Sequence, residues 1–125
     1  GIKIEAVHAY NIKRKRNSGE PFHPIGDGVG YLIHTNNKSI YHVGDTENIP
    51  EMNNLGEVDV ALLPIDGTYT MNRDEAVKAA NTIKPDIVIP IHIRDADPTK
   101  FKNILEEDTN IQVKILDEME ELVVS

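Results

Sequence analysis

Two side chains that could take part in chemistry lie directly after short apolar runs of the sequence. Asp45 follows the run at residues 40–43 and Gly44, and His92 follows the run at residues 87–91. Apolar runs of this length are typical of buried strands, and the loops after such strands commonly carry the sites of α/β folds. A carboxylate and a neutral imidazole are ligands that a divalent ion such as Zn²⁺ or Mn²⁺ accepts. The sequence therefore predicts a metal site to which Asp45 and His92 contribute.

Most of the other candidate polar residues have two possible interpretations. His23, in a loop, is the further candidate metal ligand, or else an exposed loop residue. His8, on an alternating strand, is either a ligand or a packed side chain. Thr46 is expected to bond the loop backbone and so to hold the neighbouring carboxylate. Asp66 and Tyr69 either line the site or only shape the loop that contains them.

Composition excludes several classes of protein. The 125 residues are enough for one domain with a modest core, and 13 Lys and Arg against 21 Asp and Glu give a net charge of −8. This balance argues against nucleic acid or an anionic membrane as the partner, and the basic run at residues 13–16 is interpreted as a solvated loop face. The chain has no cysteine, no apolar run of membrane-spanning length and no signal peptide, so we expect a cytoplasmic protein.

The periodicity predicts strands, a hairpin and two helices. Asn36 and Asn37 form a tight turn within a hairpin over residues 29–43, because Asn tolerates the positive φ of such turns. Asn72 and Asp97 have the residue types of helix N-caps. Further strands are expected at residues 2–9, 58–63, 87–91 and 111–116, with residues 122–124 pairing beside the last. The second part of the chain is therefore predicted to form a βαβαβ series, which favours parallel strands.

Several segments in fixed order resemble a known family. They are Gly28-Val-Gly-Tyr, Ile40-Tyr-His-Val-Gly-Asp-Thr, Ile49-Pro-Glu-Met, Asp59-Val-Ala-Leu-Leu-Pro, Tyr69-Thr-Met, Glu75-Ala and Ile89-Pro-Ile-His. Together they resemble the C-terminal half of metallo-β-lactamase-fold proteins, and within them the UlaG-like group of Zn-dependent or metal-dependent hydrolases. The resemblance implies an α/β fold, with residues 1–125 forming the C-terminal half of an αββα sandwich as a mixed sheet with helices on one face.

The resemblance also implies ligands and chemistry. In that family, the residue that corresponds to Asp45 bridges two metal ions and the residue that corresponds to His92 binds one of them. Two ions, Zn²⁺ or Mn²⁺, would lower the pKa of a water and position it to attack an ester, lactone, amide or phosphoester of a small-molecule substrate. Asp45 and His92 are therefore the expected catalytic residues, and Asp45, His92 and His23 the expected metal ligands.

The chain departs from the family pattern in one respect. The family's His-x-His-x-Asp-His motif does not occur in it, and the remaining histidine ligand is either His8 or His23. We therefore expect that the N-terminal half is missing and that this chain alone is inactive. Half of a sandwich should expose an apolar face, so we expect a homo-oligomer or pairing with an N-terminal half. The alternative function is a non-catalytic, metal-free interaction or structural module of the same fold.

Overall fold

Six strands form one mixed sheet in the order in which they occur along the chain. The computed structural model describes residues 1–125. The strands are β1 (Lys3–Ala9), β2 (Gly28–Thr35), β3 (Lys38–His42), β4 (Val60–Pro64), β5 (Ile87–Ile91) and β6 (Gln112–Val113). The first three pair antiparallel, whereas β3 to β6 pair parallel. Asn36 and Asn37 make the β2–β3 turn with φ of 48° and 64°, as predicted.

Two helices and one 3-10 turn connect the parallel strands. Helix α1 (Arg73–Ile83) begins at Asn72, whose side chain accepts a hydrogen bond from the N–H of Glu75 in a reciprocal capping box. Helix α2 (Pro98–Asp108) begins at Asp97, whose side chain accepts from Lys100. The 3-10 turn η1 (Pro50–Asn54) lies between β3 and β4. Both N-caps predicted from the sequence are therefore confirmed.

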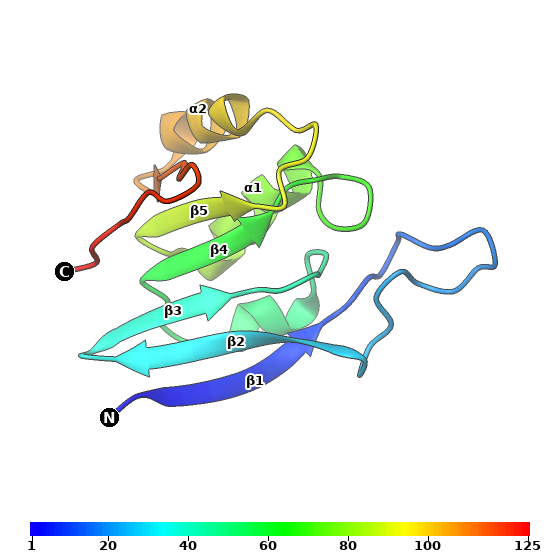
Figure 1. The fold of residues 1–125 in the computed structure, drawn as a ribbon, viewed down its shortest axis with the longest axis horizontal. Coiled ribbons are helices and arrows are strands. Elements are labelled where there is room, and N and C mark those ends of the chain that lie inside the picture. The colour runs from blue at the N-terminus through cyan, green and yellow to red at the C-terminus, as the bar shows by residue number, and fades with distance from the viewer.

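The helical elements cover one face of the sheet. Helix α1 contacts both η1 and α2, which places all of them on the same side (Figure 1). The strand register puts one row of side chains across the sheet toward this layer, and all of the row is in the hydrophobic core: Leu32, Tyr41, Ala61, Val88 and Val113. The α/β class with helices on one face is thus the observed fold.

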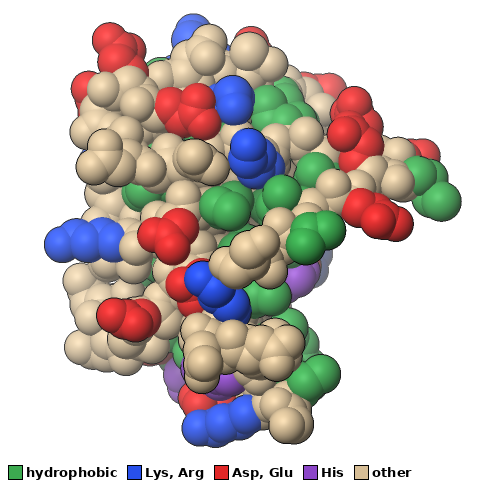
Figure 2. All heavy atoms as spheres, turned by 90° about the vertical axis from the view of Figure 1, so that its left-hand side faces the viewer, with side chains coloured by type: hydrophobic (Ala, Val, Ile, Leu, Met, Phe, Trp, Pro, Cys, Tyr) green, Lys and Arg blue, Asp and Glu red, His purple; other side chains and the backbone are tan.

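The opposite face of the sheet has no helical layer. The register aligns an apolar row there: Ile4, Ile33, Ile40, Val60 and Ile87. At the β1–β2 edge, Ile4 is 61% exposed and Tyr31 43% exposed. Figure 2, which views the end of the molecule that holds the two termini, shows hydrophobic side chains reaching the surface toward the right-hand side.

The C-terminal segment differs from the sequence prediction. Strand β6 contains only residues 112 and 113, and residues 122–124 form no strand. The chain leaves the sheet after the N–H of Lys114 donates to the carbonyl of Val88. The acidic stretch at residues 117–121 is solvent-exposed, which is the lower-energy place for charged side chains. No helix of the structure has the length and apolar character needed to cross a bilayer.

Candidate metal centre

The parallel strands deliver the candidate residues to one edge of the sheet. Strands β3, β4 and β5 run in the same direction, and the long β1–β2 loop over residues 10–27 lies at the edge where they end (Figure 1). Asp45 follows β3, Asp66 follows β4, His92 follows β5, and His23 is in the long loop. A pocket of about 220 Å³ at this edge is lined by His23, Asp45, Asp66, Tyr69, Thr70, His92 and Arg94.

The Asp45 carboxylate lies between two imidazoles. His92 Nε2 is 3.0 Å from Asp45 Oδ1, and His23 Nε2 is 3.5 Å from Asp45 Oδ2. The side chains of Asp45 and His92 are each 50% exposed and that of His23 29%. Ligands about 2.0–2.1 Å from a tetrahedral zinc ion lie roughly 3.3 Å from one another. The two measured separations are therefore of the size found between neighbouring ligands of one ion.

The chain does not build a complete metal site by itself. In residues 1–125, no group of three or more His, Cys, Asp or Glu side chains is arranged so that it could hold an ion. The donor types at Asp45, His92 and His23 fit a divalent ion, and each histidine approaches a different oxygen of the carboxylate. The residues present thus fit part of a metal site.

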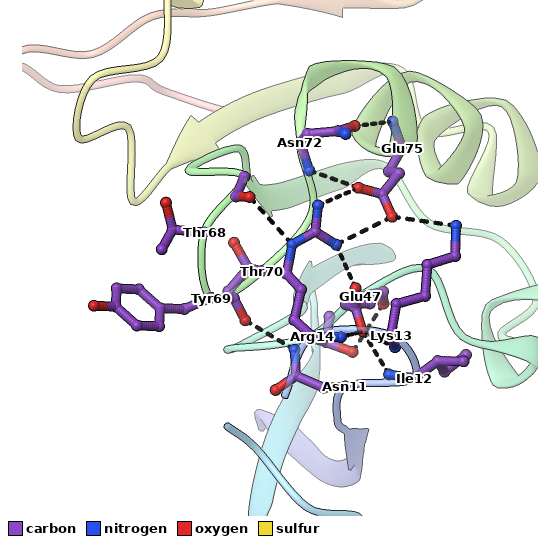
Figure 3. Close-up of polar contacts among 12 residues, drawn as sticks. Asn11, Ile12, Lys13, Arg14, Glu47, Thr68, Tyr69, Thr70, Asn72 and Glu75 are labelled. Atoms are coloured by element: carbon purple, nitrogen blue, oxygen red, sulfur yellow. Dashed lines mark hydrogen bonds and ion pairs between the residues drawn. The ribbon is translucent and has the colours of Figure 1, made fainter. Parts of the chain in front are cut away.

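Asn11, which the sequence did not single out, orients His23. Its Oδ1 accepts a hydrogen bond from the backbone N–H of His23 at 2.5 Å and lies 3.0 Å from Nδ1 of the same residue. Its Nδ2 donates to the carbonyl of Tyr69 at 2.8 Å (Figure 3). Asn11 is 5% exposed. Its partners are distant in the sequence, so no local pattern could have indicated this role.

Residues with positive φ, a backbone conformation that disfavours any residue with a side chain, lie in two of the loops at the pocket. Gly44 has φ of 74°, and a Cβ there would lie 2.6 Å from the carbonyl oxygen of Val29. Glycine is therefore required where the chain leaves β3 and presents Asp45. His92 and Arg94 have φ of 48° and 50° although neither is glycine. Such conformations cost free energy and are frequent at functional sites.

Arg14 connects the loop after β3 to the start of α1. Its guanidinium contacts the Glu47 carboxylate and makes two bonds to Glu75, at 2.5 and 3.1 Å (Figure 3). Glu47, only 2% exposed, also accepts from the N–H groups of Ile12, Lys13 and Arg14. The expectation that residues 13–16 form a solvated face is wrong for Arg14, because two carboxylates draw it inward.

Pairing with Arg14 also affects the pKa values of Glu47 and Glu75. Burial alone raises the pKa of Glu47, but hydrogen bonds from the Lys13 and Arg14 backbone and from the guanidinium outweigh it and lower the pKa. For Glu75, burial is likewise outweighed by bonds from Arg14 and Asn72, so its pKa is lowered too. Both carboxylates are thereby kept ionised, which stabilises the loop that begins at Asp45.

Thr46 and Asp66 both bond the backbone. The Thr46 hydroxyl accepts from the Tyr10 N–H at 3.1 Å, and it donates to the carbonyl of Glu47 at 2.9 Å. Thr46 therefore bonds backbone as expected, although these contacts do not reach the Asp45 carboxylate. Asp66 Oδ1 accepts from three backbone N–H groups of residues 68–70, and Oδ2 accepts from the Thr70 hydroxyl. Asp66 thus both lines the pocket and shapes its loop.

Of the two alternative histidines, only His23 reaches the pocket. His8 is exposed on β1 and lies edge-on to the ring of Tyr10. On the pocket rim, the Arg94 guanidinium carbon lies 5.0 Å from the ring centre of Tyr69. Phe22 packs edge-on against the same ring, at 4.9 Å between centres. These contacts hold the β1–β2, β4–α1 and β5–α2 loops together around the pocket.

The mixed sheet with carboxylate and imidazole side chains at its strand ends places this chain among α/β proteins whose loops carry donors suited to a divalent ion. Residues 1–92 match the family model described as the beta-lactamase superfamily domain, and the chain belongs to this family. The expected resemblance to metallo-β-lactamase-fold proteins is therefore confirmed.

Relatives of known description are longer than this chain. It is 40% identical to a UPF0173 metal-dependent hydrolase of Nanoarchaeum equitans, over 98% of the chain and 59% of the relative. It is 37% identical to one of Desulforamulus reducens, over 92% of the chain and 54% of the relative. The solved structure of Igni18, a metallo hydrolase from Ignicoccus hospitalis, superposes with a TM-score of 0.76 at 30% identity, over 94% of this chain and 50% of Igni18. The chain thus spans about half the length of these relatives.

Proposed function

We propose that this chain supplies part of the metal site of a metal-dependent hydrolase, with Asp45, His92 and His23 as ligands. The observation that carries the proposal is that both Nε2 atoms face oxygens of one carboxylate, at 3.0 and 3.5 Å. An unprotonated ring nitrogen and a carboxylate oxygen are both acceptors and repel each other, so each contact becomes favourable when a cation or a hydrogen lies between them. A divalent ion or a proton can fill that role, and the relatives are named metal-dependent.

Each residue has a separate role in this proposal. The two oxygens of Asp45 allow one carboxylate to serve two ligand positions, and each imidazole gives one directional nitrogen. A bound Zn²⁺ or Mn²⁺ ion would lower the pKa of a water and polarise the ester, lactone, amide or phosphoester that the water attacks. Arg94 and Tyr69, on the rim, border the space that remains for a small-molecule substrate.

The choice between zinc and manganese depends on ligands beyond this chain. Histidine and carboxylate donors suit both ions. Because no three donors of residues 1–125 are arranged so that they could hold one ion, we propose that the other half of the domain supplies the remaining ligands and completes a site for two ions. The chain alone is then expected to bind an ion weakly and to lack hydrolytic activity.

We further propose that the open sheet face packs against that other half. The face carries one aligned apolar row across five strands, which is exposed at Ile4, and relatives are about twice as long as this chain. Large exposed apolar faces are normally covered by a partner. The proposed partner is an N-terminal half of the same domain, and association with a second copy of the chain is the other outcome of the test. A cytoplasmic location stays a prediction from the sequence.

The metal-free alternative has one observation in its favour, which is the lack of a complete three-donor site. Metal content of the purified chain, measured by plasma mass spectrometry after incubation with Zn²⁺ or Mn²⁺, separates the two functions. Metal that is present in the wild type and in the exposed-histidine control His8→Ala, but lost in Asp45→Ala and His92→Ala, supports the hydrolase site. Equal metal in all four proteins favours the interaction module, and so does a lack of metal in all four when an N-terminal half of a relative has been added.

A further inference from the structure

The orientation of the Asn11 side-chain amide is determined by backbone groups on both of its ends. Its Oδ1 lies 2.5 Å from the backbone nitrogen of His23, and a backbone N–H can only donate. Its Nδ2 lies 2.8 Å from the backbone oxygen of Tyr69, and a carbonyl can only accept. Exchanging the amide oxygen and nitrogen would break both bonds, so the amide has one permitted orientation.

This orientation determines which ring nitrogen of His23 carries the hydrogen. Nδ1 of His23 lies 3.0 Å from the same Asn11 Oδ1, which is an acceptor without a hydrogen. Nδ1 must therefore donate. A neutral imidazole has a single N–H, so Nε2 is left with its lone pair, and it is Nε2 that faces Asp45 Oδ2 at 3.5 Å.

The Asn11 amide also fixes the position of the ring. Asn11 is 5% exposed, and its own backbone N–H donates to the carbonyl of His23 at 2.8 Å. The residue thus bonds His23 through both backbone and side chain, and it ties the β1–β2 loop to the loop that carries Tyr69. Buried polar groups with all partners satisfied hold one geometry, since any alternative leaves a group unpaired.

We infer that Asn11 is a positioning residue that selects the Nδ1–H tautomer of His23 and directs the Nε2 lone pair into the pocket. A ring nitrogen can bind a metal ion only through its lone pair, so this tautomer is the competent one. The role toward a metal rests on the proposed function, whereas the tautomer itself does not. The two statements can therefore fail separately.

The tautomer is measured on the metal-free chain labelled with ¹⁵N. Long-range proton–nitrogen correlation distinguishes a protonated ring nitrogen from a bare one, and the spectra are recorded at about pH 9, well above the ordinary pKa of free imidazole. The expected result is a protonated Nδ1 and a bare Nε2 for His23. A protonated Nε2 in the wild-type chain overturns the inference, whatever the chain does with metal.

Two variants test the cause. Asn11→Ala removes the acceptor, and the His23 ring is expected to shift to the Nε2–H form that free histidine favours in water. Asn11→Asp loses the bond to the Tyr69 carbonyl but keeps an acceptor for both the His23 N–H and Nδ1, so the folded variant is expected to retain the Nδ1–H form. Asn81→Ala, at an exposed position of α1, is the matched control and should leave His23 unchanged. A folded Asn11→Ala chain that keeps the Nδ1–H form overturns the inference.

Zinc affinity supplies the second readout. Loss of a group that orients a ligand typically lowers metal affinity by about 10–100-fold, and Asn11→Ala is expected to fall in that range, with Asn11→Asp much closer to the wild type. If the tautomer changes as expected while no protein in the series binds zinc, the positioning role of Asn11 stands and the proposed metal site fails. If zinc binds equally in wild type and Asn11→Ala, the positioning role toward the metal fails.

Discussion

The Nε2 atom of His92 lies 3.0 Å from the Oδ1 atom of Asp45, although the two residues follow strands that are separated in the sheet by β4. Parallel strands end at the same edge, so residues that follow them meet there even when they are distant in the sequence. The left-handed backbone at His92, with φ of 48°, turns the chain at the point where β5 ends. The contact thus depends on the sheet and on the turns directly after its strands.

The first prediction concerns the glycine that precedes Asp45. In Gly44→Ala the new Cβ meets the carbonyl oxygen of Val29, and the positive φ adds strain. Gly56→Ala is the matched control, because Gly56 has φ of 76°, close to the 74° of Gly44, with open space around it. We expect Gly56→Ala to lose about 1–2 kcal/mol, the cost of left-handed backbone, and Gly44→Ala clearly more. Urea unfolding measures both, and equal losses would contradict the close approach at Gly44.

Local sequence patterns were sufficient to predict much of the fold. The apolar runs, the Asn36–Asn37 turn and the two N-cap residues depend on near neighbours, and the structure confirms them. The positions of Asp45 and His92 at strand ends followed from the same patterns. The short β6 was mispredicted, because an apolar run does not reveal that a strand lies at the sheet edge.

The rest of the candidate site depends on how the long β1–β2 loop folds back. The sequence pointed to His23 as the further ligand with His8 as the alternative, and it gave no reason to select Asn11. Arg14 belongs to the basic run at residues 13–16, whose composition predicts a solvated loop. Its partners Glu47 and Glu75 are separated from it in the sequence by several strands and loops. Contacts of this kind depend on tertiary structure, which the hydrophobic periodicity of the sequence does not predict.

The second prediction concerns the free energy of unfolding that Arg14 contributes. Arg14→Met leaves the nearly buried Glu47 without its opposite charge, and removing one partner of a buried pair costs about 3 kcal/mol. Lys15→Met, at the exposed neighbouring position, should change stability by less than about 0.5 kcal/mol. Chemical unfolding at neutral pH provides the comparison. Equal, small effects of the two substitutions would show that Arg14 is solvated after all.

The third prediction concerns pH. The pKa of Glu75 is lower in the folded chain than its ordinary value, so its stabilising effect is full above the unfolded pKa and is lost as pH falls through the folded pKa. Glu75→Gln should therefore destabilise the chain at pH 7 by about 2 kcal/mol, the usual effect of hydrogen bonds to a charged group.

The difference between wild type and Glu75→Gln should then shrink as the pH falls below about 4.3, the ordinary pKa at which glutamate in the unfolded chain is protonated, and it should vanish only once the pH has passed the lowered pKa of the folded chain. Urea unfolding of both proteins between pH 7 and pH 3 measures the difference. Glu57→Gln, at an exposed position, controls for general loss of charge. A difference that stays constant down to pH 3 would show that the Glu75 charge is not what stabilises the cluster.

The fourth prediction concerns the open sheet face. Ile4→Asp places a charge in the apolar row, and it should weaken association with a separately produced N-terminal half of a relative or with a second copy. Asn81→Asp adds the same charge on α1, on the other face, and should have no effect. Light scattering with and without the N-terminal half reports both outcomes. If the wild-type chain stays monomeric at micromolar concentration and does not associate with the added N-terminal half, the proposed role of this face is contradicted.

The ring nitrogens of the five histidines test the proposed metal site most directly. Zinc added to the ¹⁵N-labelled chain should shift the Nε2 signals of His23 and His92, and leave those of His8, His34 and His42 in place. The shifts should be absent in Asp45→Ala. Shifts confined to the other histidines, or none at millimolar zinc, would contradict the assignment of Asp45, His23 and His92 as ligands.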